Sequence, residues 1–167
     1  MSYKNYITEI PNFPIDGVNF KDISPLLADQ ETYRSALVEM GRQVRLPDYW
    51  VGIDSRGYLF SAGLATYFGG GVVCARKEGK TPGTKVSVSY DLEYGSATLE
   101  MGTRIDNEGT VIIVDDVLAT GGTIKATNEL AEKAGYKVLG SLVLVDLKYV
   151  PRVENFNLDV KSVVTYE

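Results

Sequence analysis

The sequence predicts an α/β fold with a mostly parallel central sheet flanked by helices. Short apolar runs with strand character alternate along the chain with segments whose apolar residues recur at helical spacing. One of these runs, Val111–Val114, consists only of β-branched residues and predicts a buried strand. The 167 residues contain no internal repeat, low-complexity segment or linker, so we expect a single domain over residues 1–167.

The first half of the chain supplies the outer elements of this prediction. Residues 1–28 contain several prolines and glycines and predict an irregular cap rather than a sheet element. Asp29 is placed to cap a helix over residues 30–45, because apolar residues follow a helical stripe there. The next expected elements are a strand at 49–53, a helix at 58–68, a strand at 72–76 and a basic, flexible loop at 76–83.

The second half opens with two alternating segments. Apolar and polar residues alternate over 86–90, and the period of two returns over 97–101, with Gly95 and Ser96 between the two segments. This pattern on both sides of a turn predicts an antiparallel hairpin. The remaining expected elements are the strand at 111–114, a helix to about Ala134 that Gly135 ends, and strands at 138–145 and 160–164.

A carboxylate pair and a glycine loop follow the strand at 111–114. Asp115 and Asp116 come first, and residues 119–123 (ATGGT) then lead into the helix. Glycines let backbone N–H groups approach a ligand closely, and a helix N-terminus offers unpaired donors, so this loop predicts a phosphate site. The carboxylates suit sugar hydroxyls or a metal, and a phosphorylated sugar satisfies both halves. The alternative is an ordinary strand-to-helix turn with the acids at its solvent edge.

Three polar segments follow predicted strands and should meet at one edge of the sheet. They are Asp54–Gly57, Arg76-Lys77 and Asp115-Asp116. Ligands of open α/β sheets bind beyond the carboxyl ends of the strands. The sequence therefore predicts an active site at this edge.

Composition removes several classes of function. The net charge of −5 gives no broad basic face for nucleic acid, and the absence of histidine excludes His-based nucleophilic catalysis. A P-loop is excluded because Cys74 stands where the glycine before Gly79-Lys80-Thr81 is required. Cys74 is the single cysteine, and we expect it to be a small core residue in a reducing compartment. Without a membrane-length apolar run or a signal-peptide core, a cytoplasmic protein without membrane partners is expected.

Residues 111–123 resemble the phosphoribosyl pyrophosphate (PRPP) motif of the type I phosphoribosyltransferases. Four further motifs, in the same order along the chain, are similar to those of the adenine phosphoribosyltransferase family. They are 13–25 (FPIDGVNFKDISP), 54–57 (DSRG), 76–83 (RKEGKTPG) and 89–95 (SYDLEYG). The resemblance covers nearly the whole chain. It implies the type I phosphoribosyltransferase fold, with a small N-terminal hood over 1–28 and a flexible β-hairpin lid over 84–101.

The resemblance also implies an activity, a cofactor and partners. The expected reaction joins adenine to PRPP and gives AMP and pyrophosphate in purine salvage. Mg²⁺ is expected to arrive with the pyrophosphate rather than on direct protein ligands. In this family the Arg76-Lys77 stretch can reach the neighbouring subunit's site, which implies a homodimer.

Roles at the sugar, phosphate and pyrophosphate follow where the motifs match. The backbone and hydroxyls of residues 119–123 (Ala119, Thr120, Gly121, Gly122, Thr123) would hold the 5′-phosphate. Asp115 and Asp116 would engage the ribose hydroxyls and the positive charge that builds at the anomeric carbon. The pyrophosphate would be bound by Ser55, Arg56, Arg76, Lys77 and Lys80, which oppose its negative charge. A solvated basic loop is the alternative for Lys77 and Lys80.

Roles at the base follow in the same way. Phe20 would stack on the purine, the backbone beside Asn19 and Lys21 would contact the base edge, and Val117 and Leu118 would line the opposite side. A core aromatic of the hood is the alternative for Phe20. Glu93, on the lid, would exchange a proton with a purine nitrogen, since a chain without histidine needs a carboxylate for this step. A surface glutamate without a catalytic role is the alternative for Glu93.

Two other functions compete with this one. A xanthine or guanine phosphoribosyltransferase shares the PRPP motif, but the motifs around Phe20 and over 89–95 argue against it. A non-catalytic regulator that senses PRPP would need a basic DNA-binding module, and the sequence offers none. Asn19 and Lys21 depart from what many relatives have beside the base.

Overall fold

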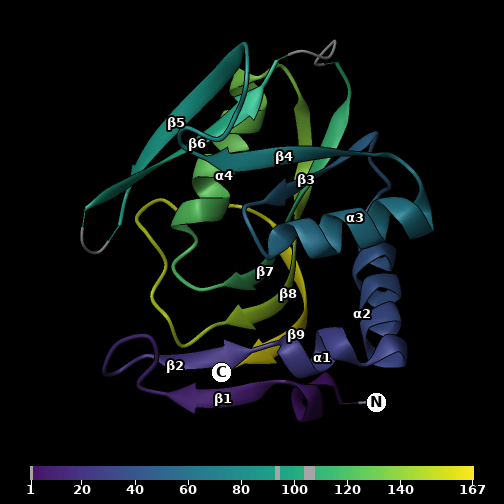
Figure 1. The fold of residues 1–167 in the computed structure, drawn as a ribbon, viewed down its shortest axis with the longest axis vertical. Helices are drawn as coiled ribbons and strands as arrows, with labels where there is room; N and C mark the ends of the chain where they lie inside the picture. Colours follow the sequence, from purple (N-terminus) through teal and green to yellow (C-terminus); the bar gives the residue numbers. More distant parts are fainter. Residues whose placement is uncertain (1, 93–94, 104–107) are drawn as a thin grey trace.

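A seven-stranded sheet forms the centre of the protein, a count that applies to residues 2–92, 95–103 and 108–167, which the computed structural model describes. The strand order is β5-β6-β4-β3-β7-β8-β9 (Figure 1). The five strands from β4 to β9 are mutually parallel. Their bounds are β3 Tyr49–Ile53, β4 Gly71–Lys77, β7 Thr110–Leu118, β8 Lys137–Leu147 and β9 Val160–Tyr166. The predicted α/β fold class is confirmed.

Helices cover both faces of the sheet. On one face lie α2 (Gln30–Arg42) and α3 (Gly57–Phe68), and on the other lies α4 (Gly122–Lys133). Successive side chains of a strand point to opposite faces, so Ile112 and Val114 pack in one core cluster while Val111 and Ile113 pack in the other. Burial on both faces explains why the four residues Val111–Val114 within β7 are all apolar and β-branched.

The helix predicted over 30–45 is confirmed, with an earlier end. The Asp29 carboxylate accepts a hydrogen bond from the Thr32 N–H at 2.8 Å and caps α2 as expected. The helix ends at Arg42, three residues before the expected position, with Gln43 as its C-cap. The helix after the glycine loop ends at Lys133, and Gly135 follows it with a φ of 103°.

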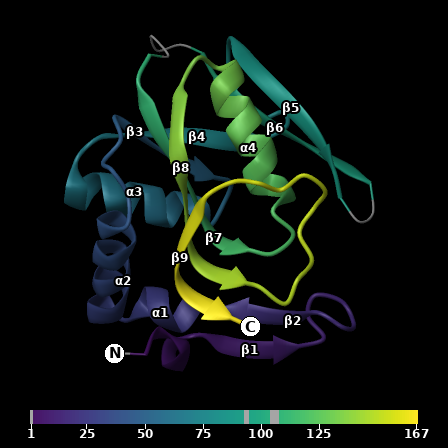
Figure 2. The same ribbon diagram turned by 180° about the vertical axis from the view of Figure 1, so that it is seen from behind.

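The N-terminal segment is more regular than predicted. It contains a short 3₁₀ turn (η1, Tyr3–Tyr6), two antiparallel strands, β1 (Thr8–Pro11) and β2 (Asn19–Asp22), and the short helix α1 (Ser24–Ala28). The expectation of an irregular cap was wrong because Pro11 and Pro14 occupy a strand end and the connecting turn, where no ladder donor is needed. Figures 1 and 2 show this two-stranded sheet at one end of the molecule, alongside β9.

The predicted hairpin is confirmed, whereas the predicted burial of Cys74 is wrong. Strands β5 (Lys85–Asp91) and β6 (Ser96–Gly102) pair antiparallel, and β6 continues the sheet beyond β4. In β4 the core side chains are Val73 and Ala75, so Cys74 points to the other side and is exposed. Among the described residues, no helix is both long and apolar enough to cross a membrane.

Candidate active site

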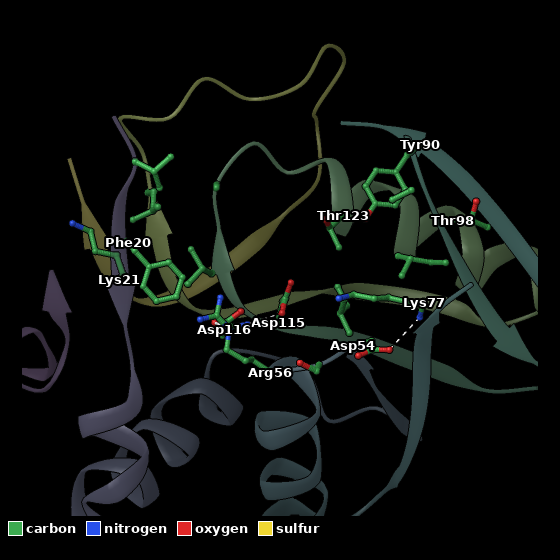
Figure 3. A pocket seen from close by; sticks show the side chains of 18 of the residues that line it. Phe20, Lys21, Asp54, Arg56, Lys77, Tyr90, Thr98, Asp115, Asp116 and Thr123 are labelled. Atoms are coloured by element: carbon green, nitrogen blue, oxygen red, sulfur yellow. Dashed lines mark hydrogen bonds and ion pairs between the residues drawn. The ribbon is translucent and has the colours of Figure 1, made fainter. Parts of the chain in front are cut away.

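A cavity of about 710 Å³ lies beyond the carboxyl ends of β3, β4 and β7. The chain leaves β3 for β4 on one side and later returns to β7 on the other, which is the arrangement that opens a crevice in α/β sheets. In Figure 3, Phe20 lies at one end of the cavity, Asp54 and Lys77 at the other, and Asp115 and Asp116 between them. The segments predicted to meet here do so: residues 54–56, Lys77 and Asp115-Asp116 all line the cavity.

The two carboxylates lie within β7 rather than after it. On the β3 side the pairing of β7 ends at Val114, whereas on the β8 side it continues to Leu118. The strand therefore continues past the end of β3, and Asp115 and Asp116 face the space above it. The missing neighbour strand, which the sequence does not reveal, exposes these side chains to the cavity.

Close contacts surround this carboxylate pair. The Asp116 Oδ2 forms an ion pair with Arg56 Nε at 2.8 Å, and the Asp116 N–H donates to Asp115 Oδ1 at 2.9 Å. Burial, and secondarily the neighbouring Asp116 charge, raise the pKa of Asp115 well above its ordinary range. A side chain at Gly57 would place its Cβ 2.7 Å from the Val114 carbonyl oxygen, so glycine is required where α3 meets β7. The pair thus combines one ion-paired carboxylate with one that retains its proton to higher pH.

The glycine loop forms the next wall. Ala119 and Thr123 line the cavity, and the helix α4 begins at Gly122, directly after Gly121 with its φ of 84°. Gly121 has no side chain that could cap this end, and the Gly122 N–H donates to Thr120 Oγ1 at 3.4 Å, so the remaining first-turn N–H groups of α4 are available to a ligand. Thr120, Gly121 and Gly122 belong to the same loop but are not among the described residues that line the cavity.

The basic segment is only partly directed into the cavity. Lys77 lines it, with its N–H donating to Asp54 Oδ2 at 3.2 Å, and Lys80 Nζ lies 4.0 Å from the same oxygen. Arg76 precedes Lys77 in β4 and therefore faces the opposite side, beside Tyr58 and Cys74. The structure does not bring Arg76 to the cavity.

The aromatic end of the cavity belongs to β2. Phe20 contacts the edge of the Phe13 ring at a centroid distance of 5.2 Å, and the Arg56 guanidinium carbon lies 5.1 Å from the Phe20 centroid. The Asn19 amide and the Lys21 ammonium both bind Glu9 Oε2, each at 2.7 Å. Figure 3 shows the Lys21 side chain pointing away from the cavity. Asn19 and Lys21 are both among the residues that line the cavity, but the Lys21 ammonium is bound by Glu9 rather than directed at Phe20.

The remaining predicted residues differ in whether they line the cavity. Val117 lines the cavity, but Leu118 is buried in the core cluster of α4. Glu93 lies outside the described residues. The sequence reasoning missed Leu147, Tyr90 and Thr98, which also line the cavity. Their signals were weak: Leu147 ends a predicted strand, while Tyr90 and Thr98 belong to the predicted hairpin.

Comparison with known proteins agrees with this geometry. The family model described as "Phosphoribosyl transferase domain" matches residues 40–159. Adenine phosphoribosyltransferase of Carboxydothermus hydrogenoformans is 50% identical over 88% of both chains. That of Mycoplasma mobile is 43% identical over 98% of this chain and 96% of its own. The chain belongs to the adenine phosphoribosyltransferase family.

Solved structures of the family have the same fold. The enzyme of Thermoanaerobacter pseudethanolicus superposes with a TM-score of 0.91 at 36% identity, covering 98% of both chains. The Saccharomyces cerevisiae enzyme, solved with an iminoaltritol bisphosphate and adenine, gives a TM-score of 0.85 at 34% identity, covering 96% of this chain and 95% of its own. The family expected from the sequence is confirmed.

The donor set of the cavity fits a Mg²⁺ ion that arrives with a phosphorylated substrate. Across the described ranges, no group of three or more His, Cys, Asp or Glu side chains could hold a metal ion. The cavity offers two adjacent carboxylates instead. Mg²⁺ is commonly bound through one or two carboxylates together with substrate phosphates.

Proposed function

We propose that this protein transfers the phosphoribosyl group of PRPP to adenine, forming AMP and releasing pyrophosphate. The observation that supports it is the order of groups along one cavity: an aromatic ring, a carboxylate pair and a basic segment, with a phosphate-type loop alongside. This order along the cavity matches the order of base, ribose and pyrophosphate in the reacting substrates. The two relatives described above, both named adenine phosphoribosyltransferase, support the same reaction.

The base binds against Phe20. Stacking of a purine on an aromatic ring stabilises it, and the backbone of residues 18–21 offers N–H and C=O groups to the base edge. Because Glu9 binds the Asn19 amide and the Lys21 ammonium, the contacts that we propose for the base edge come from the backbone of these residues. Val117 lines the other side of the base, with the buried Leu118 supporting the strand behind it.

The 5′-phosphate binds at the loop of residues 119–123. The backbone N–H groups of this loop and of the first turn of α4 would donate to the phosphate oxygens, and the hydroxyls of Thr120 and Thr123 would add donors. The positive end of the α4 dipole favours the same ligand. Ala119, Gly121 and Gly122 have side chains small enough for the phosphate to approach the backbone.

The reaction breaks the bond between the anomeric carbon and pyrophosphate and forms a bond from that carbon to a purine nitrogen. Positive charge builds on the sugar while the bond breaks, and Asp116 stabilises it. Asp115, with its raised pKa, can donate a hydrogen bond to a ribose hydroxyl as well as accept one. The Arg56 ion pair neutralises Asp116 before the substrate binds, and the pyrophosphate then competes for the guanidinium.

The leaving pyrophosphate binds at the opposite end from the base. Ser55, Arg56 and Lys77 line that part of the cavity, and Lys80 lies beside Asp54 at its edge. Mg²⁺ bound to the pyrophosphate would reduce the charge that must be separated. The lysines supply the remaining positive charge.

Glu93 and the segment over 84–101 complete the proposal. The purine loses a proton when its nitrogen attacks, and the Glu93 carboxylate accepts it. Closure of the hairpin as a lid excludes water, which would otherwise hydrolyse the electrophilic sugar.

A homodimer is part of the proposal. Leu59 and Tyr67 on α3 are 46% and 49% exposed and border an apolar groove between α2 and α3. A second copy would cover this groove, and Arg76, which faces away from its own cavity, would then be free to reach the partner's site. Leu59→Glu should convert the dimer to a monomer in sedimentation velocity, whereas a parent protein that sediments as a monomer would contradict this part. A cytoplasmic location is also proposed, supported by the single cysteine.

The reaction is tested by product formation from PRPP and Mg²⁺, with adenine, hypoxanthine, guanine and xanthine offered separately. AMP from adenine alone is the expected result. Turnover of an oxopurine only would contradict the proposal that adenine binds against Phe20. Binding of PRPP without turnover of any base would instead indicate a sensor.

A further inference from the structure

The connection between β8 and β9, residues 148–159, passes behind the loop of residues 119–123. Figures 1 and 2 show it beside the end of β7 and the start of α4. The Val153 N–H donates to the Thr120 carbonyl at 2.8 Å. The Phe156 ring lies so close to Gly121 that a Cβ there would approach Phe156 Cε2 to 2.5 Å. The connection therefore supports the loop from the side opposite the cavity.

Arg152 makes the most extensive contact in this connection. Its Nη1 donates to the carbonyl of Ala119, and also to those of Leu147 at 3.0 Å and Val150 at 3.2 Å. Its Nη2 forms an ion pair with Asp146 Oδ1. The Arg152 and Asp146 side chains are 23% and 13% exposed, so the pair is largely removed from water. A planar guanidinium can bind a carboxylate and several carbonyls at once, which a lysine ammonium does less well.

These contacts determine how the loop presents its N–H groups. In a trans peptide the C=O and N–H point in opposite directions. The carbonyls of Ala119 and Thr120, bound by Arg152 and by the Val153 N–H, point toward the β8–β9 connection. The N–H groups in the same two peptides, those of Thr120 and Gly121, consequently point away from the connection, toward the side where Ala119 and Thr123 line the cavity.

We infer that Arg152, paired with Asp146, is a positioning residue for PRPP. It touches no substrate, and it keeps the N–H groups of Thr120 and Gly121 oriented for the 5′-phosphate. The inference rests on the phosphate role proposed for residues 119–123. Preorganised donors bind an anion more tightly because the loop does not have to be ordered when the ligand arrives.

The inference predicts an unequal effect on the two substrates. Leu147, which lines the base side of the cavity, is held by strand pairing with Tyr166 of β9, and this pairing does not depend on Arg152. The neighbouring Lys148 N–H also donates to the Tyr166 carbonyl at 2.9 Å. The 119–123 loop, by contrast, would lose the Ala119 contact and keep, from this connection, the Val153 hydrogen bond and the packing of Phe156. Loss of Arg152 should therefore weaken PRPP binding more than adenine binding.

The test is steady-state kinetics of Arg152→Ala with each substrate varied in turn. We expect the KM for PRPP to rise about tenfold or more, the cost of one charge-assisted hydrogen bond, and the KM for adenine to stay within about threefold. Millimolar guanidinium should restore the KM for PRPP, whereas urea at the same concentration should not. Equal changes in both KM values, or no response to guanidinium, would overturn the inference.

Three further variants make the result decisive. Lys148 lies on the same connection, and its side chain forms a surface ion pair with Glu167 at 3.7 Å. Lys148→Ala removes this exposed pair and should leave both KM values unchanged. Asp146→Asn removes the carboxylate charge that pairs with Arg152 at nearly constant volume. It should raise the KM for PRPP, though less than Arg152→Ala does, and it replaces Arg152→Ala as the test if that variant does not fold. Thr123→Ala tests the loop itself. If it leaves the KM for PRPP unchanged, the proposed phosphate site is wrong. If it raises that KM while neither Arg152→Ala nor Asp146→Asn does, only the role of Arg152 is wrong.

Discussion

Replacing Gly121 by alanine should damage the phosphate loop for two separable reasons. Gly121 has a φ of 84°, a backbone conformation that residues with a Cβ rarely adopt, and its added Cβ would lie 2.5 Å from Phe156 Cε2 and 2.7 Å from Phe156 Cδ2. Gly69 provides a partial control, since it has the same φ of 84° and a Cβ added there would meet nothing within 4 Å, although its ψ is 178° whereas that of Gly121 is 0°. The contact with Phe156 is therefore isolated by comparing Gly121→Ala with and without the Phe156 ring.

The expected free energies follow from these two contributions. The left-handed backbone at Gly121 costs a non-glycine residue about 1–2 kcal/mol. At Gly69, whose φ of 84° and ψ of 178° lie in a region that is essentially reserved for glycine, alanine should cost about 1–3 kcal/mol. Displacement of a packed ring adds about 1–3 kcal/mol, so Gly121→Ala should lower the free energy of unfolding by about 2–5 kcal/mol. It should also raise the KM for PRPP, whereas Gly69→Ala should not.

Urea unfolding of the two variants, and of both Gly121 forms in a Phe156→Ala background, measures each contribution. Without the ring, Gly121→Ala should cost only the backbone part, so the double-mutant cycle should give a coupling of about 1–3 kcal/mol. A coupling of zero would refute the reasoning.

Three more predictions concern the cavity. Phe20→Ala should raise the KM for adenine about 5- to 100-fold, which corresponds to the loss of one base-stacking contact, and should leave the KM for PRPP nearly unchanged. Equal changes of the two KM values in steady-state kinetics would contradict this prediction. Because burial raises the pKa of Asp115, the folded protein keeps a proton that the unfolded chain loses above about pH 4, so this group lowers stability as pH rises. The free energy of unfolding of Asp115→Asn, measured in urea relative to the parent, should therefore increase from about pH 4.5 to about pH 7.5. A difference that shrinks as pH rises would contradict the prediction. Lys77→Gln should raise the KM for PRPP and weaken its salt dependence, whereas Lys137→Gln at the opposite sheet edge should do neither.

Periodicity predicted the sheet and its helices because each element has a burial pattern of its own. The run Val111–Val114 is buried on both faces, and Asp29 caps α2 through its side chain. The failures concern relations between elements. Cys74 lies in an apolar run, yet only one face of β4 meets the core there. Likewise, β1 and β2 stabilise each other by pairing across a turn, which local composition does not reveal.

The candidate site was predicted as a set of loops but not as a set of side-chain directions. Strand ends identified Arg56, Lys77 and the carboxylates, and the structure brings them to one cavity. Arg76 faces the other side because it is one residue out of phase with Lys77, a distinction that needs the register of β4. The contribution of Arg152 has no local motif at all, since it depends on a connection folding back over a loop far away in sequence.

The central position of β3 has a consequence for how the protein is made. β3 is flanked by β4, which is synthesised soon after it, and by β7, which is synthesised much later. Until β7 emerges from the ribosome, one edge of β3 has no partner and is open to wrong pairing with another nascent chain. The carboxylates arrive on the strand that closes this edge, so a chain able to bind PRPP is also one whose sheet has been completed. Substrate present during synthesis would then favour completed chains by mass action.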